Sequence, residues 1–173
     1  MTKFSVGPVI SDHLGTLEDE RTHTARWQDW AMLYGLPAAA GAPLAIWNVQ
    51  LQGIGEVVGG LAILAGFLFG LVVFVFQLRL QVTADPRVAP QGLLPRLLDQ
   101  LFANVSYAVL VGFMTVGVSI AASATRSLDA KTGDLMAVNR WWSAVLVLLF
   151  AHLMLLLAMS LKRLRRAYQE LKR

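Results

Sequence analysis

Four long apolar runs dominate this 173-residue chain and constrain its fold more than any other feature. They cover residues 30–51, 54–78, 105–122 and 141–161. A helix rises about 1.5 Å per residue, so about 20 apolar residues cross a hydrocarbon core about 30 Å thick. Charged residues make up 15% of the chain, against about 25% in an average soluble protein. We therefore expect an all-α integral membrane protein with four transmembrane helices.

The runs divide the chain into three parts. Residues 1–29 form a polar N-terminal tail, for which we expect a short surface helix. Residues 30–161 form the membrane domain, and residues 162–173 extend its last helix as a basic tail. Because two residues separate the first run from the second, these two helices are expected to form a tight hairpin.

Proline interrupts the first run at Pro37 and Pro43. Proline has no backbone N–H and kinks a helix, and it leaves the carbonyl four residues earlier without its usual partner. Such a carbonyl is tolerated within a membrane only where protein or water supplies a donor. We therefore expect the first helix to be bent and packed against other helices.

Leucines recur at helical spacing in the connection between the second and third runs. They are Leu93, Leu94, Leu97, Leu98 and Leu101, with polar residues between them, and Pro95 suits the first turn of a helix. This pattern predicts an amphipathic segment before the third helix. The segment either lies in the membrane interface or runs straight into that helix.

The distribution of Lys and Arg predicts the topology. Twelve of the fifteen lie in the two tails and in residues 79–104, and three lie between the third and fourth runs. The positive-inside rule then places both termini in the cytoplasm of a plasma (inner) membrane protein. The cluster Lys162, Arg163, Arg165 and Arg166 is expected to contact anionic lipid headgroups rather than nucleic acid.

Glycines form a stripe along the second run at Gly55, Gly59, Gly66 and Gly70. Two of these spacings are GxxxG, which lets helices approach closely in lipid. The stripe packs either against the first helix, which is equally rich in small residues, or against another copy of the chain.

The third run carries the most polar stripe of the membrane region. Asn104, Thr115 and Ser119 share one face, and Arg126 lies beyond its end. One interpretation is a wet path lined by these side chains. The other is a packing face in which Thr115 and Ser119 bond to their own helix.

Two ionisable side chains fall inside the predicted spans. His152 lies near the middle of the fourth run, and Glu56 lies near the outer end of the second. Ionisable groups at membrane depth are often functional. His152 is either a proton-handling group or a neutral histidine bonded to another helix, and Glu56 is either part of an acidic ring or a solvated interfacial carboxylate.

The sequence offers no support for an enzyme or a resident cofactor. It has no cysteine, no phosphate-binding loop and no HExxH or GxSxG motif. His13 and His23 flank the acidic residues 18–20, but their spacing matches no standard metal-ligand motif. We expect no catalytic, cofactor or metal site.

These observations favour a homo-oligomeric channel or pore-like protein, or a membrane-perturbing effector controlled from its cytoplasmic side. The bundle of one chain is filled by its own side chains, so a path would need several copies. An alternative of another class is a membrane anchor or accessory subunit that docks a cytosolic partner protein. A proton-coupled transporter that uses Glu56 and His152 is a third candidate.

Overall fold

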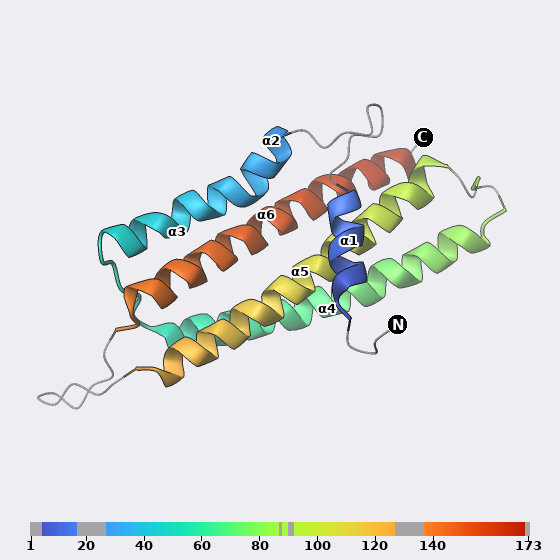
Figure 1. The fold of residues 1–173 in the computed structure, drawn as a ribbon. Helices are drawn as coiled ribbons and strands as arrows, with labels where there is room; N and C mark the ends of the chain where they lie inside the picture. The colour runs from blue at the N-terminus through green and yellow to red at the C-terminus, as the bar shows by residue number, and fades with distance from the viewer. Residues whose placement is uncertain (1–4, 17–26, 87, 90–91, 127–136, 172–173) are drawn as a thin grey trace, which may run out of the picture.

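The computed structural model describes residues 5–16, 27–86, 88–89, 92–126 and 137–171, and these residues are helical with short connections. The elements are α1 (Gly7–Gly15), α2 (Trp27–Trp30), the π-helical turn η1 (Ala31–Gly35), α3 (Leu36–Ile46), α4 (Ile54–Ala84), α5 (Leu93–Ala124) and α6 (Arg140–Leu171). Figure 1 shows the long helices lying side by side. No strand occurs among the described residues, which confirms the predicted all-helical class.

Three helices are long and apolar enough to cross a membrane: α4, α5 and the stretch Arg140–Gln169 of α6. Their outward surfaces carry large apolar side chains such as Ile63 and Phe67 of α4, which are 78% and 69% exposed. Water would not accommodate such a surface, whereas lipid does. The length and composition of these three helices confirm the prediction of a protein with transmembrane helices.

The first predicted span is shorter in the structure. Its apolar helical part is Ala31–Ile46, after which the chain leaves the helix at Trp47. Asn48 and Gly53 in the following connection adopt positive φ values of 54° and 66°. These left-handed residues turn the chain before α4 begins.

The neighbours of α3 and α4 differ from the predicted hairpin. The order across the bundle is α3, α6, α5, α4, so α3 packs on α6 and α4 packs on α5 (Figure 1). The connection is short, but its Leu51 binds the start of α6: the Leu51 carbonyl accepts from Val138 N–H at 3.1 Å, and the Leu51 N–H donates to Ser143 Oγ at 3.0 Å. These bonds bring α6 against α3, and the expected pairing of the first two helices is corrected.

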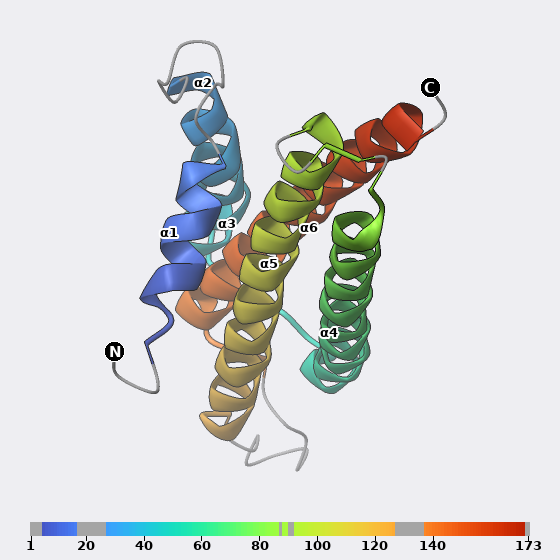
Figure 2. The same ribbon diagram turned by 90° about the vertical axis from the view of Figure 1, so that its right-hand side faces the viewer.

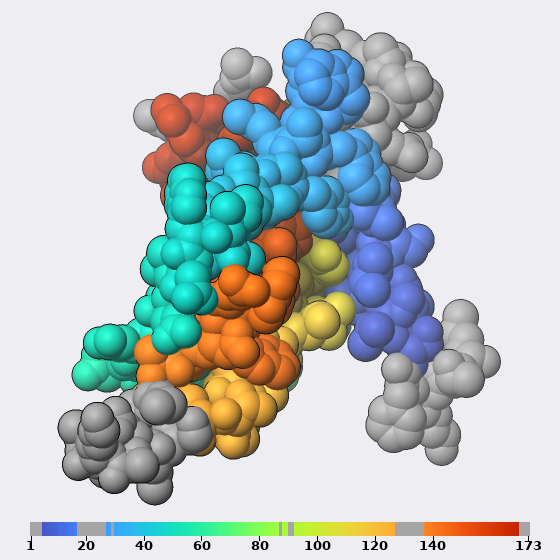
Figure 3. All heavy atoms as spheres, turned by 60° about the vertical axis from the view of Figure 1, so that its left-hand side comes forward, coloured from blue at the N-terminus to red at the C-terminus, as the bar shows by residue number. Residues whose placement is uncertain are grey.

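Gly41 explains the close approach of α3 to α6. A Cβ atom at this position would lie 2.6 Å from the Ala144 carbonyl oxygen and 3.1 Å from Leu148 Cβ. Only glycine leaves room for that backbone. The small-residue face of the first run therefore packs on α6 (Figure 3, where α3 lies over the orange helix).

The amphipathic leucine segment and the third span form one helix. α5 begins at Leu93 and runs without a break to Ala124, with Pro95 in its first turn. Proline costs no hydrogen bond in a first turn, because those N–H groups have no partner within the helix. Of the two alternatives for this segment, the structure has the one in which it runs straight into the span.

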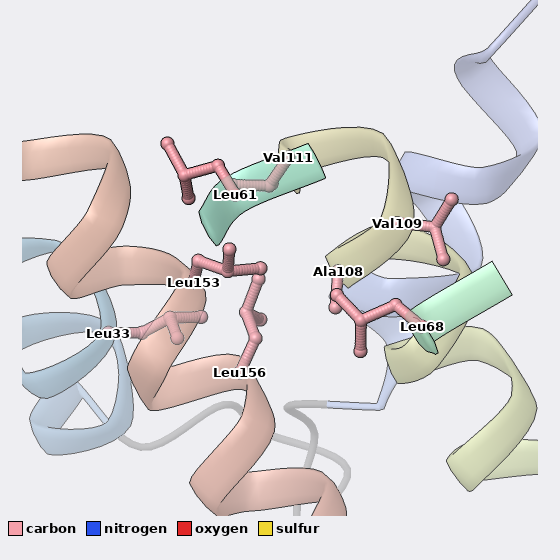
Figure 4. Packing of buried hydrophobic residues seen from close by; sticks show 8 residues of the cluster. All are labelled: Leu33, Leu61, Leu68, Ala108, Val109, Val111, Leu153 and Leu156. Carbon is pink, nitrogen blue, oxygen red and sulfur yellow. The ribbon is translucent and has the colours of Figure 1, made fainter. Parts of the chain in front are cut away.

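The apolar core lies between α4, α5 and α6. Leu61 and Leu68 of α4 meet Ala108 and neighbouring residues of α5, and Leu153 and Leu156 of α6 complete the cluster with Leu33 of η1 (Figure 4). These side chains are almost fully buried. The core therefore joins the helices that the apolar runs predicted.

Candidate functional site

α1 lies against α5 on the side opposite to α4 (Figure 2). Most of its residues are exposed, but His13 is fully buried. The His13 ring stacks on the ring of Tyr107 of α5, with centroids 4.1 Å apart and planes 7° apart. This histidine fixes the N-terminal helix to the bundle.

Asn104 of α5 connects His13 to α6. Its carboxamide lies between the Arg163 guanidinium on one side and His13 and Thr16 on the other. A guanidinium only donates hydrogen bonds, so it requires the amide oxygen. In that orientation the Asn104 oxygen accepts from Arg163 Nη1 at 2.7 Å and Nε at 3.1 Å, and its nitrogen donates to His13 Nδ1 at 2.8 Å and Thr16 Oγ1 at 2.9 Å.

This orientation fixes the chemical form of His13. Nδ1 accepts a hydrogen bond from the Asn104 amide, so the imidazole is neutral and carries its own hydrogen on Nε2. Burial lowers the pKa of His13 below its usual value of 6.5, and the nearby His152 and Arg163 lower it further. A bond to the Asn104 oxygen would oppose this shift, but that oxygen faces Arg163.

Arg163 ties the end of α1 to both long helices. Its guanidinium donates to the Thr16 carbonyl at 2.8 Å and to the Gln100 carbonyl at 3.2 Å, in addition to Asn104. The Thr16 hydroxyl in turn donates to the His13 carbonyl at 2.7 Å. We call His13, Thr16, Asn104 and Arg163 the α1 latch.

A row of aromatic rings leads from the latch toward the middle of α6. Tyr107 meets His152 edge to face at 5.9 Å, and Tyr34 of η1 stacks on His152 at 5.2 Å. Among the described residues, neither His13 Nε2 nor His152 Nε2 has a hydrogen-bond partner. The two histidines therefore belong to one polar region between α1, η1, α5 and α6.

His152 Nδ1 donates to the Leu33 carbonyl at 2.9 Å. That carbonyl lies four residues before Pro37, which has no N–H to give it. The chain forms a π-helical turn at Ala31–Gly35 just before this proline, and such turns accompany helix irregularities. His152 thus supplies the donor that the sequence predicted for a proline-interrupted helix.

The other residues of the predicted polar path lie inside the single chain. Thr115 and Ser119 are fully buried, and their hydroxyls donate to the Val111 and Thr115 carbonyls at 2.7 and 2.8 Å. These are bonds to the preceding turn of their own helix. Arg126 follows the end of α5 and is partly buried.

Glu56 and the glycine stripe lie on the outside of the chain. Glu56 is exposed in the first turn of α4, where the helix dipole favours a carboxylate. Nothing lies within 4 Å of a Cβ built at Gly55, Gly59, Gly66 or Gly70. α4 instead meets α5 through Leu61, Leu68 and other buried side chains, so the stripe takes no part in packing against α3.

The basic cluster of α6 divides into two groups. Lys162, Arg165 and Arg166 are exposed, whereas Arg163 points into the latch. His23 and the acidic residues 18–20 lie outside the described residues. His13, their predicted neighbour in a conceivable metal site, bonds to Asn104 instead.

The sequence identified Asn104 and His152 as candidate residues but missed the partners Thr16, Tyr34 and Tyr107. The contact of His152 could have been inferred from Pro37, since the carbonyl freed by this proline requires a donor and His152 is an intramembrane donor.

Comparison with protein-family models, with curated proteins and with solved structures finds no match to this chain.

Proposed function

We propose that this chain is a membrane effector of the channel or pore-like class, closed in this conformation and controlled from its cytoplasmic side by α1. The observation that carries the proposal is the α1 latch. It holds a nine-residue helix over polar side chains of two long helices. The predicted path along α5 is closed at the same time, because Thr115 and Ser119 are buried within the chain.

The interface of α1 is small enough for this helix to dissociate from the bundle. Its interface consists of His13, Thr16 and a few apolar side chains, and most of its surface is exposed. Segments with few buried contacts open at low free energy. Departure of α1 would remove His13 and Thr16 from the Asn104 amide nitrogen. A donor left unsatisfied there favours a rearrangement of α5 and α6, because unpaired polar groups are costly in lipid.

The proposed topology follows the positive-inside rule. Thr16, Gln100 and Arg163 lie at one end of the bundle, where the Arg79–Asp99 ion pair also joins α4 to α5 at 2.6 Å. We place this end, and with it both termini, at the cytoplasmic face of a plasma (inner) membrane. The shorter stretch Ala31–Ile46 would then be the fourth crossing.

Several copies would be needed to form a conducting path. The polar face of α5 is filled within one chain, whereas the glycine stripe of α4 is exposed. We propose that α4 contacts a second copy of the chain through this stripe, as GxxxG helices do in lipid. This arrangement leaves the α1 latch accessible from the cytoplasm.

The test is dye retention by vesicles that contain the purified chain. Asn104→Leu removes the hydrogen bonds of Asn104 to Arg163 and those to His13 and Thr16. This variant is expected to increase leakage. Gln77→Leu removes an equivalent amide from the exposed surface of α4 and is the matched control. Equal retention by Asn104→Leu, Gln77→Leu and the unmodified chain would contradict the proposal.

A further inference from the structure

We propose that His13 is a proton-binding site that releases α1 from the bundle when it becomes charged. This inference rests on the proposed function, because it names the signal that acts on the α1 latch. The hydrogen-bond directions around Asn104 leave no place for a second proton on the imidazole.

Protonation of His13 places a hydrogen on Nδ1, since Nε2 already carries one. Nδ1 then faces the Asn104 amide nitrogen at 2.8 Å, and two donors oppose each other. The bond that holds α1 to α5 is lost. Two buried donors without acceptors are costly, and here one of them, the His13 imidazolium, also carries a charge.

Rotation of the Asn104 amide does not resolve the conflict. It would turn the oxygen toward the imidazolium but the nitrogen toward Arg163, whose Nη1 and Nε lie 2.7 and 3.1 Å away. A guanidinium has no acceptor for that nitrogen. Either orientation of Asn104 therefore opposes one donor to another, and only neutral His13 fits the docked state.

Among the residues that the structure describes, the groups around His13 add positive charge and no negative charge. Arg163 and His152 face it from α6, and Tyr107 stacks on it from α5. Tyr34 reaches the same region from η1 through His152, and phenol hydroxyls stay uncharged below pH 8. On α1 itself, Asp12 lies on the exposed side. A proton on His13 thus finds no carboxylate among the described residues that pack on it.

The direction of the pH effect follows from linkage. Docked His13 has a pKa below 6.5, and released His13 takes up a proton near its ordinary value of about 6.5. Between these two pKa values the released state binds more protons, so docking weakens as the pH falls below about 6.5. At pH 5.5 the docking equilibrium decreases by at most about tenfold, since one pKa unit corresponds to a factor of ten.

The test measures the distance between α1 and α6 in nanodiscs by pulsed electron resonance. The chain has no cysteine, so Ile10→Cys and Leu161→Cys place two unique spin labels at exposed positions. A His23→Gln background leaves His13 and His152 as the two histidines. Spectra are compared between pH 7.5 and 5.5, which is above the range in which carboxylates usually titrate.

We expect the docked distance to dominate at pH 7.5 and to lose population at pH 5.5. His13→Phe keeps the ring that stacks on Tyr107 and should remove this pH dependence. Asn104→Asp supplies a carboxylate that accepts from both Arg163 and the imidazolium, so this variant should stay docked at pH 5.5. His152→Gln keeps an N–H for Leu33 and should respond to pH as the parent chain does.

An unchanged distance in the parent chain at both pH values would overturn the inference. So would a full pH response in His13→Phe, release of α1 at pH 5.5 in Asn104→Asp, or loss of the response in His152→Gln alone. Dye retention measured on the same samples separates the two proposals. Release of α1 without leakage contradicts the proposed function and supports the proton site, whereas α1 docked in sealed vesicles at pH 5.5 contradicts the proton site alone.

Discussion

His152 on α6 donates a hydrogen bond to the carbonyl of Leu33, a group that Pro37 has left without its usual partner. The distance between His152 Nδ1 and the Leu33 oxygen is 2.9 Å, and both residues are buried. One side chain thus repairs a proline-interrupted helix and joins η1 to α6. The bond also leaves His152 Nε2 as the free nitrogen of the ring.

A double-mutant cycle tests this relationship. His152→Leu leaves the Leu33 carbonyl unpaired and should lower the free energy of unfolding by about 1–3 kcal/mol. Pro37→Ala restores an N–H at the position from which a helix normally supplies this bond. The double variant should therefore lose less than the sum of the single losses, with a coupling above about 0.5 kcal/mol in detergent unfolding. Additive losses would show that His152 does not serve the Leu33 carbonyl.

Gly41 and Gly60 offer the same substitution in opposite surroundings. Gly41→Ala places a Cβ 2.6 Å from the Ala144 carbonyl oxygen, whereas nothing lies within 4 Å of that atom at Gly60. Forcing α3 from α6 should cost about 1–3 kcal/mol. Gly60→Ala should instead gain about 0.5–1 kcal/mol, because it reduces the entropy of the unfolded chain. Similar unfolding midpoints for both variants would contradict the packing of α3 on α6.

The exposed stripe of α4 predicts the behaviour of bulky substitutions. Gly59→Leu with Gly66→Leu should leave the fold of a single chain intact, because no atom lies within 4 Å of either Cβ. If α4 contacts a second copy, native mass spectrometry should record fewer chains per particle. Gly117→Leu on α5 has the same open surroundings and is the control. An unchanged particle mass in the double variant would exclude this stripe as the subunit interface.

The two groups of basic residues on α6 should respond differently to substitution. Arg165→Gln with Arg166→Gln removes two exposed charges and should weaken binding of anionic lipid by about 1 kcal/mol per residue. The readout is the rise in unfolding midpoint that phosphatidylserine produces over phosphatidylcholine. Arg140→Gln, at the other end of α6, should keep this rise. A full rise in the double variant would argue against lipid contact by these residues.

The long helices were predictable because their signal is local. Membrane thickness requires about 20 apolar residues, and the runs that became α4, α5 and α6 meet that length in sequence. Their neighbours were not predictable in the same way. The bonds from Leu51 to Val138 and Ser143 join residues about 90 positions apart, and they bring α6 against α3.

In the candidate site, too, the residues with a local signal were predictable and the long-range contacts were not. Asn104 and His152 are recognisable as polar residues within apolar runs. His13 lies in a polar tail, and its partner Asn104 is 91 residues away in sequence. No periodicity connects two such residues, so the latch required the tertiary arrangement of α1, α5 and α6.

Permeability and the position of α1, recorded on the same vesicles, test the central claim most directly. Asn104→Leu should shift the distance between labels at residues 10 and 161 toward the released population. Leakage should increase in proportion to that population, and Gln77→Leu should change neither quantity. Vesicles that remain sealed while α1 is fully released would contradict the claim that this helix keeps the chain closed.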